Sequence, residues 1–101
     1  MVNLPYSKNL FFYVFAGSRG GGNRIRIMDS LQNLPKNANQ LANELELNYR
    51  AIQHHLDVLE KNNLITKIGD KYGANYFPSI FFEANIETYD EITAKSKKAK
   101  V

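Results

Sequence analysis

The chain has 101 residues, no cysteine, and 13 basic against 10 acidic side chains, which gives a formal net charge of +3. This length allows one domain with a modest core, and the lack of cysteine excludes disulfides, thiolate zinc sites and cysteine nucleophiles. The charge surplus is mild and lies largely in the last seven residues, so charge alone does not indicate nucleic acid as a partner.

Residues 1–22 combine an apolar run at 10–16 (Leu-Phe-Phe-Tyr-Val-Phe-Ala) with the glycine-rich residues 17–22. The run is too short to cross a bilayer, and with only Lys8 before it a signal peptide is disfavoured. We expect the run to pack on the domain or on a second subunit. The glycines predict a flexible joint rather than a phosphate-binding loop, because no Gly-Lys-Ser/Thr ending follows them.

Three short amphipathic helices are predicted next. Asn23 is the expected cap of the first, which ends at Pro35. Asn37 caps the second, with Gln40 at the capping-box position, and Asn48 caps the third. Their apolar residues recur at helical spacing: Ile27, Met28, Leu31 and Leu34; Ala38, Leu41, Ala42 and Leu45; Ile52, Leu56 and Leu59.

A β-hairpin is predicted after the third helix. Residues 64–68 are rich in β-branched side chains, residues 69–73 favour a turn, and residues 74–77 form a second strand before Pro78. Three helices followed by a short hairpin predict a winged helix-turn-helix, a mostly helical α+β fold. We therefore place a winged-helix domain at residues 23–78, between N- and C-terminal extensions.

The C-terminal extension, residues 79–94, is predicted to be one helix capped by Ser79, followed by a flexible basic tail at 95–101. Its large apolar stripe needs a partner surface, and the aromatic N-terminal run is the candidate, either within one chain or across a dimer. The residues assigned to a dimer interface are Phe11, Phe12, Phe15, Phe82, Ile86 and Tyr89.

Residues 23–78 resemble the winged-helix transcription regulators of the ArsR-like superfamily, especially its short archaeal members. The residues that carry this resemblance are Asn-Arg-Ile-Arg-Ile-Met at 23–28, Asn-Gln-Leu-Ala-Asn-Glu-Leu at 39–45, the His-His-Leu-x-x-Leu run within 52–65, and the hairpin at 69–76. The resemblance implies a dimeric, sequence-specific DNA-binding regulator. The cysteine pair of the founding metal sensors is missing, so thiolate metal sensing is not implied.

The outward face of the third helix is the predicted DNA-reading surface. Arg50 is placed where the first turn of such a helix enters the major groove, and arginine is the usual bidentate partner of guanine. Gln53 and His54 follow it, while for Tyr49 packing competes evenly with DNA contact. The predicted DNA-binding residues are Asn48, Tyr49, Arg50, Gln53 and His54; Asn37, Asn39 and Gln40 at the start of the second helix; and Lys71 and Tyr72 at the wing tip.

His55 is expected to differ from its neighbour, because it lies beside Leu59 on the helical wheel. We predict a partly buried, hydrogen-bonded structural histidine. Adjacent side chains lie about 100° apart on a helix, so the two histidines cannot easily share a metal ion. Arg24 and Arg26, next to the glycines, are candidates for contact with the DNA backbone.

No catalytic motif, metal site or cofactor site is predicted, and we expect a cytoplasmic homodimeric regulator rather than an enzyme. The main alternative is a winged-helix protein-interaction module that does not bind DNA. A weaker alternative is peripheral membrane association through the apolar run and the basic tail. A small-molecule effector has no signature in the sequence.

Overall fold

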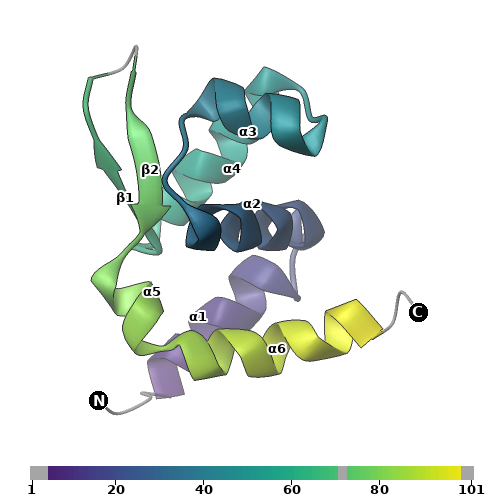
Figure 1. Ribbon diagram of the computed structural model, residues 1–101. Coiled ribbons are helices and arrows are strands. Elements are labelled where there is room, and N and C mark those ends of the chain that lie inside the picture. The colour runs from purple at the N-terminus through teal and green to yellow at the C-terminus, as the bar shows by residue number, and fades with distance from the viewer. Residues whose placement is uncertain (1–4, 71–72, 99–101) are drawn as a thin grey trace.

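The computed structural model describes residues 5–70 and 73–98, which form one winged helix-turn-helix with terminal helices packed beneath it (Figure 1). The described elements are α1 (Pro5–Phe15), α2 (Gly21–Asn33), α3 (Ala38–Leu45), α4 (Tyr49–Lys61), β1 (Ile65–Ile68), β2 (Asn75–Pro78), α5 (Ile80–Ala84) and α6 (Ile86–Lys98). Helices α2–α4 and the hairpin make the upper part of Figure 1, and α1 and α6 lie below α2. This arrangement confirms the predicted fold class.

Local capping sets the starts of α3 and α4, as the sequence predicts. The Asn37 side chain accepts from the Gln40 backbone N–H, and the Gln40 side chain accepts from that of Asn37, each at 2.8 Å. The Asn48 side chain accepts from the Arg50 N–H at 2.7 Å. These bonds satisfy helix N–H groups that have no partner inside the helix.

The start of α2 differs from the prediction, because Asn23 is not its cap. The helix begins at Gly21, and Gly20 precedes it with a φ of 90°. A Cβ atom on Gly21 would lie 2.6 Å from the carbonyl oxygen of Phe15, and one on Gly20 would lie 2.8 Å from Cε1 of His55. The glycines are therefore a tightly packed turn, and the prediction of a flexible joint was wrong for these two positions.

The hairpin is antiparallel and is tied to the linker between α2 and α3. Its register pairs Ile65 with Pro78 and Ile68 with Asn75. Tyr76 of β2 also exchanges backbone hydrogen bonds with Lys36 of the linker, at 2.8 and 3.2 Å. The wing therefore has a fixed position beside α2 and α3. The wing-tip residues 71–72 lie outside the described residues.

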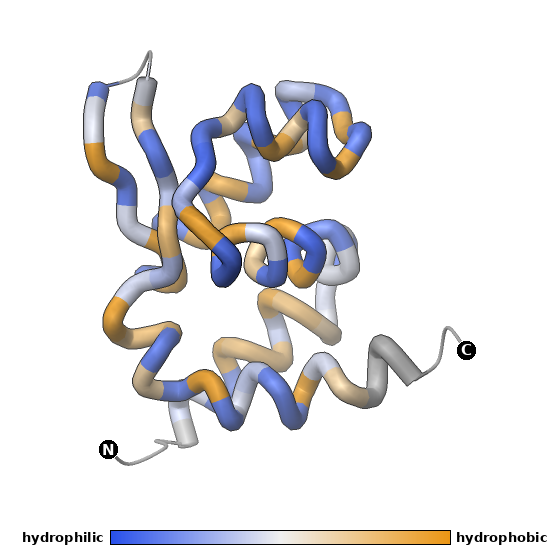
Figure 2. The backbone as a smooth tube through the Cα atoms, viewed as in Figure 1, coloured by the Kyte–Doolittle hydropathy of each residue, from blue (hydrophilic) through white to orange (hydrophobic). Residues whose placement is uncertain are grey.

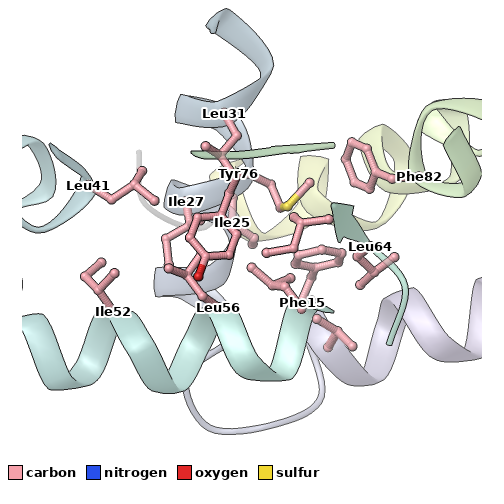
Figure 3. Packing of buried hydrophobic residues seen from close by; sticks show 14 of the residues in the cluster. Phe15, Ile25, Ile27, Leu31, Leu41, Ile52, Leu56, Leu64, Tyr76 and Phe82 are labelled. Atoms are coloured by element: carbon pink, nitrogen blue, oxygen red, sulfur yellow. The ribbon is translucent and has the colours of Figure 1, made fainter. Parts of the chain in front are cut away.

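One hydrophobic cluster joins the winged helix to the terminal helices. Ile52, Leu56 and Leu59 of α4 are completely buried, and in Figure 3 Ile52 and Leu56 point toward Leu41 and Ile27. Figure 2 shows α1 as a largely apolar segment beneath this core. The apolar run of the N-terminal region is thus a core helix of the same chain.

The C-terminal extension contains two helices where the sequence predicts one. Ser79 caps α5 by accepting from the Phe82 N–H at 3.0 Å, as expected. The chain then turns at Asn85, whose side chain accepts a hydrogen bond from Ser7 Oγ at 3.2 Å and donates to the Phe81 carbonyl at 3.0 Å. Asn85 is buried between α5 and α6, and its contact with α1 fixes the turn between these two helices.

Four of the six residues assigned to a dimer interface are instead buried within one chain. Phe82 lies with its ring centroid 5.9 Å from that of Phe11 and 4.9 Å from that of Tyr89. The ring centroids of Phe15 and Tyr89 are 4.9 Å apart, and the Tyr89 hydroxyl donates a hydrogen bond to Asp29 Oδ1 at 2.8 Å. The assignment of these four to a dimer interface was wrong, because the two terminal segments cover each other. Phe12 remains exposed and Ile86 is half-buried.

The adjacent glycines that start α2 give a matched test of this packing. Gly21→Ala should lower the free energy of unfolding by about 1–3 kcal/mol, because its Cβ would press on the Phe15 carbonyl. Gly22→Ala has no atom within 4 Å of the added Cβ and should stabilise the protein by about 0.4–1 kcal/mol. Urea unfolding measures both changes. Equal effects of the two substitutions would contradict the tight turn.

Candidate nucleic-acid interface

The outward side of α4 carries the residues that the sequence predicts for DNA contact. Arg50 and His54 are exposed and are four residues apart, so they lie on the same side of the helix. Among the described residues neither side chain has a hydrogen bond or ion pair. Both lie in the first half of α4 and are available to an external partner.

A small polar hollow joins α3, α4 and the wing. It has a volume of about 30 Å³, and Asn37, Asn39, Tyr49, Gln53 and Tyr76 are among its lining residues. Gln53 Nε2 donates to the Tyr49 hydroxyl at 2.9 Å, so these two side chains position each other. The structure thus brings together predicted site residues from two separate helices.

The capping residues have a second property that suits phosphate. The side-chain oxygens of Asn37, Gln40 and Asn48 accept hydrogen bonds from backbone N–H groups. Capping therefore uses the oxygen of each side-chain amide, and the NH₂ group of the amide can still donate to another molecule. Since phosphate oxygens only accept hydrogen bonds, these amides, of which those of Gln40 and Asn48 are exposed, have suitable chemistry for a nucleic-acid backbone.

Helix α3 is held on α2 by a polar cluster that the sequence analysis missed. Lys36 Nζ lies 3.0 Å from Glu44 Oε1 and donates to Ser30 Oγ at 2.7 Å, while Ser30 Oγ donates to Glu44 at 2.9 Å. The hydrogen bonds from Lys36 and then from Ser30 lower the pKa of the Glu44 carboxyl. Lys36 is therefore engaged within the protein. The charge pattern alone did not reveal this pairing, because it joins a linker to a helix.

The structure does not place Arg24 and Arg26 where they would touch DNA freely. Arg24 is only 3% exposed and its guanidinium lies inside the protein. Arg26 donates to the Leu45 carbonyl at 2.6 Å and to Asn23 at 3.1 Å, so it supports the C-terminal end of α3. Both arginines orient helices, and the expectation of backbone contact was wrong for Arg24.

His55 is the structural histidine that its wheel position predicts. It is 7% exposed, and its Nδ1 lies 3.2 Å from Nη1 of Arg24. Burial, then the charge of Arg24, then that of His54 lower the pKa of the His55 imidazole. In contrast, His54 is exposed, although the two ring centroids are only 5.4 Å apart.

Exposed acidic residues lie on both sides of the molecule, and Glu44, Asp57 and Glu60 belong to α3 and α4. Exposed acidic residues line α5 and α6: Glu83, Glu87, Asp90 and Glu91. In Figure 1, α6 lies on the opposite side of α2 from α3 and α4. The balance of charge therefore does not by itself distinguish the side of α4 from that of the terminal helices.

The described part of the chain contains neither a cluster of side chains that could ligate a metal nor a helix suited to span a membrane. Within residues 5–70 and 73–98, no three His, Asp or Glu side chains gather in a way that could hold a metal ion. The helices of this part are all too short or too polar to cross a membrane.

Comparison with known proteins agrees with this geometry. Residues 21–67 match the family model described as bacterial regulatory protein, arsR family. The matched residues run from α2 into β1, so this part of the chain is similar to the arsR family of regulators. That family is described as one of regulatory proteins, which agrees with the expectation of a regulator rather than an enzyme. No curated protein sequence matches the chain.

Several solved structures share this fold. HlyU from Vibrio cholerae N16961 has 19% identity and a TM-score of 0.65, with 92% of this chain and 99% of that chain covered. BldR, a transcriptional regulator from Sulfolobus solfataricus, has 16% identity and a TM-score of 0.68, with 94% and 71% covered. The adhesin competence repressor AdcR from Streptococcus pyogenes has 11% identity and a TM-score of 0.63, with 93% and 72% covered.

The Asn48 cap can be tested separately from any role in binding. Asn48→Ala should lower the free energy of unfolding by about 0.5–2 kcal/mol, because two N–H groups at the start of α4 lose their acceptor. Asn48→Asp keeps an acceptor there and should retain most of the stability. Denaturant unfolding of both variants measures this difference, and an Ala variant as stable as the original protein would contradict the cap.

Proposed function

We propose that this ArsR-like protein binds double-stranded DNA sequence-specifically as a homodimer and regulates transcription in the cytoplasm. The observation that carries the proposal is the division of α4 into two sides. One side is fixed by the fully buried Ile52, Leu56 and Leu59. The other presents Arg50 and His54 to solvent, next to the polar hollow.

The proposed contacts follow from the chemistry of each side chain. Arg50, with Gln53 and His54, meets base edges in the major groove, where arginine pairs with guanine O6 and N7. Asn37, Asn39, Gln40 and Asn48 donate to phosphates at the start of α3 and α4. Tyr49 completes the hollow between them. Lys71 and Tyr72, which lie outside the described residues, are proposed to reach the flanking backbone.

A second copy of the chain is the proposed partner of α1. Tyr6, Phe12 and Tyr13 are exposed on this helix, and Phe12 is 57% accessible. Phe12 also lines a groove of about 270 Å³ between α1 and α6, which has Lys8 and Glu91 at its edges. In a two-fold dimer, opposite charges on one patch pair with their counterparts on the other. Ile86 lines a different groove and is not part of this proposed face.

Such a dimer would place two α4 helices on one side of the duplex. The proposed operator is an inverted repeat with half-sites about one helical turn apart. The family match and the fold support DNA binding, while the shape of the dimer rests on the exposed face of α1 alone.

Fluorescence polarisation with fragments of the source genome, over a salt series, tests DNA binding. Affinity should fall as salt rises, with a preference retained over competitor DNA. Arg50→Ala should weaken the free energy of binding to the preferred DNA site by about 1–3 kcal/mol. Arg19→Ala is the matched control, since Arg19 is exposed in the turn between α1 and α2.

Two results would overturn the DNA-binding proposal. One is tight binding that survives Arg50→Ala, Gln53→Ala and His54→Ala together. The other is no shift at low salt combined with a stoichiometric protein partner in a pull-down, which would support the interaction-module alternative.

Sedimentation equilibrium at tens of micromolar tests the dimer. The original protein should sediment as a dimer, and Phe12→Asp should give monomers, because it places a charge in the proposed contact. Ile80→Asp is the matched control, since Ile80 is 86% exposed on α5, away from this face. A monomeric original protein would contradict the proposal.

A further inference from the structure

The buried guanidinium of Arg24 links three parts of the chain. Its Nε donates to the Val14 carbonyl at the end of α1, at 2.9 Å. Its Nη2 donates to Ser18 Oγ at 2.7 Å and to the Arg19 carbonyl at 3.2 Å, both in the following turn. Its Nη1 lies 3.2 Å from Nδ1 of His55 on α4. One side chain thus connects the end of α1 to the helix proposed to read DNA.

This geometry defines the protonation state of His55. A guanidinium can only donate hydrogen bonds, so Nδ1 of His55 must accept and carries no proton. The ring is then the neutral tautomer with its proton on Nε2. A second proton would have to bind at Nδ1, where it would face an Arg24 N–H and place two positive charges side by side.

The surroundings give the protonated ring no compensation. Gly20 packs against it, and a Cβ there would lie 2.8 Å from Cε1, so the ring has little room to move away. The charged groups that act on the ring are Arg24 of α2 and His54 of α4, and both oppose a further positive charge. Tyr13 of α1 interacts electrostatically with Arg24, and the backbone carbonyl of Arg19 accepts a hydrogen bond from the Arg24 guanidinium.

We propose that the Arg24–His55 pair is an acid-sensitive joint: protonation of His55 breaks the link between α4 and the turn after α1, and DNA affinity falls. The effect on DNA rests on the function proposed above. The effect of pH on the Arg24–His55 contact is independent of that function, because both residues belong to one chain.

Proton linkage gives the direction in which the stability of the fold changes with pH. An unfolded or locally opened chain takes up a proton at His55 near the ordinary value of 6.5, whereas the folded chain resists it because its pKa is lowered. The stabilising contribution is therefore complete well above pH 6.5. It is lost progressively as pH falls through 6.5 toward the lower folded pKa.

The adjacent histidines provide a matched pair of variants. His55→Gln keeps an oxygen that can accept from Arg24 but cannot ionise. His54→Gln removes the exposed histidine and leaves the contact between Arg24 and His55 in place. The acid sensitivity should therefore disappear in His55→Gln and remain in His54→Gln.

The experiment measures thermal melting and DNA binding of the full chain between about pH 8 and pH 5. The melting temperature of the original protein and of His54→Gln should drop by several degrees on acidification, whereas that of His55→Gln should lose most of this dependence. On acidification, DNA affinity should fall several-fold in the original protein and in His54→Gln, each relative to its own value at about pH 8, and not in His55→Gln.

NMR titration of the two histidine rings in the original protein keeps the proposal testable if His55→Gln does not fold. A His55 ring that titrates at or above pH 6.5, or an unchanged pH profile in a folded His55→Gln, would overturn the joint. Loss of DNA binding at every pH, with the stability data as expected, would overturn only the proposed DNA function.

Discussion

The burial of Ile52, Leu56 and Leu59 is the constraint on which the rest of the site depends. All three are completely buried in the hydrophobic core, and each such side chain contributes about 1.5–3 kcal/mol relative to exposure. Turning α4 about its axis would expose them, so the orientation of the helix is fixed. Arg50 and His54 project outward as a consequence, whatever their own interactions are. The candidate site is therefore positioned by apolar packing and not by its polar residues.

The terminal helices complete the core from the opposite side. Phe11 and Phe15 of α1 pack on Phe82 and Tyr89 of α5 and α6, and these rings close the underside of α2. Tyr89 also donates a hydrogen bond to Asp29 of α2, so its buried hydroxyl is satisfied. The same arrangement leaves one face of α1 exposed. A single helix thus serves the core with one side and is available to a second copy with the other.

Arg24 shows how a charge can be retained in so small a core. A buried guanidinium is costly unless its donors are satisfied, and here carbonyls, a hydroxyl and an imidazole accept from it. The consequence is that the neutral state of His55 becomes part of the structure. A small domain without disulfides has few ways to couple distant segments. This buried polar link is one such coupling, and it lies directly behind the helix proposed to read DNA.

The local features could be predicted from the sequence: the Asn37 and Asn48 caps, the three helices, the hairpin, the outward side of α4 and the structural role of His55. These depend on residues three or four positions apart, so periodicity and capping chemistry are enough to predict them. What covers the aromatic segments, where Arg24 points, and the break of the C-terminal helix at Asn85 could be learned only from the folded chain. The contact that anchors this break joins Ser7 to Asn85, 78 positions apart. An apolar stripe or an arginine in a sequence shows that a partner is needed, but the identity of that partner depends on how the whole chain folds.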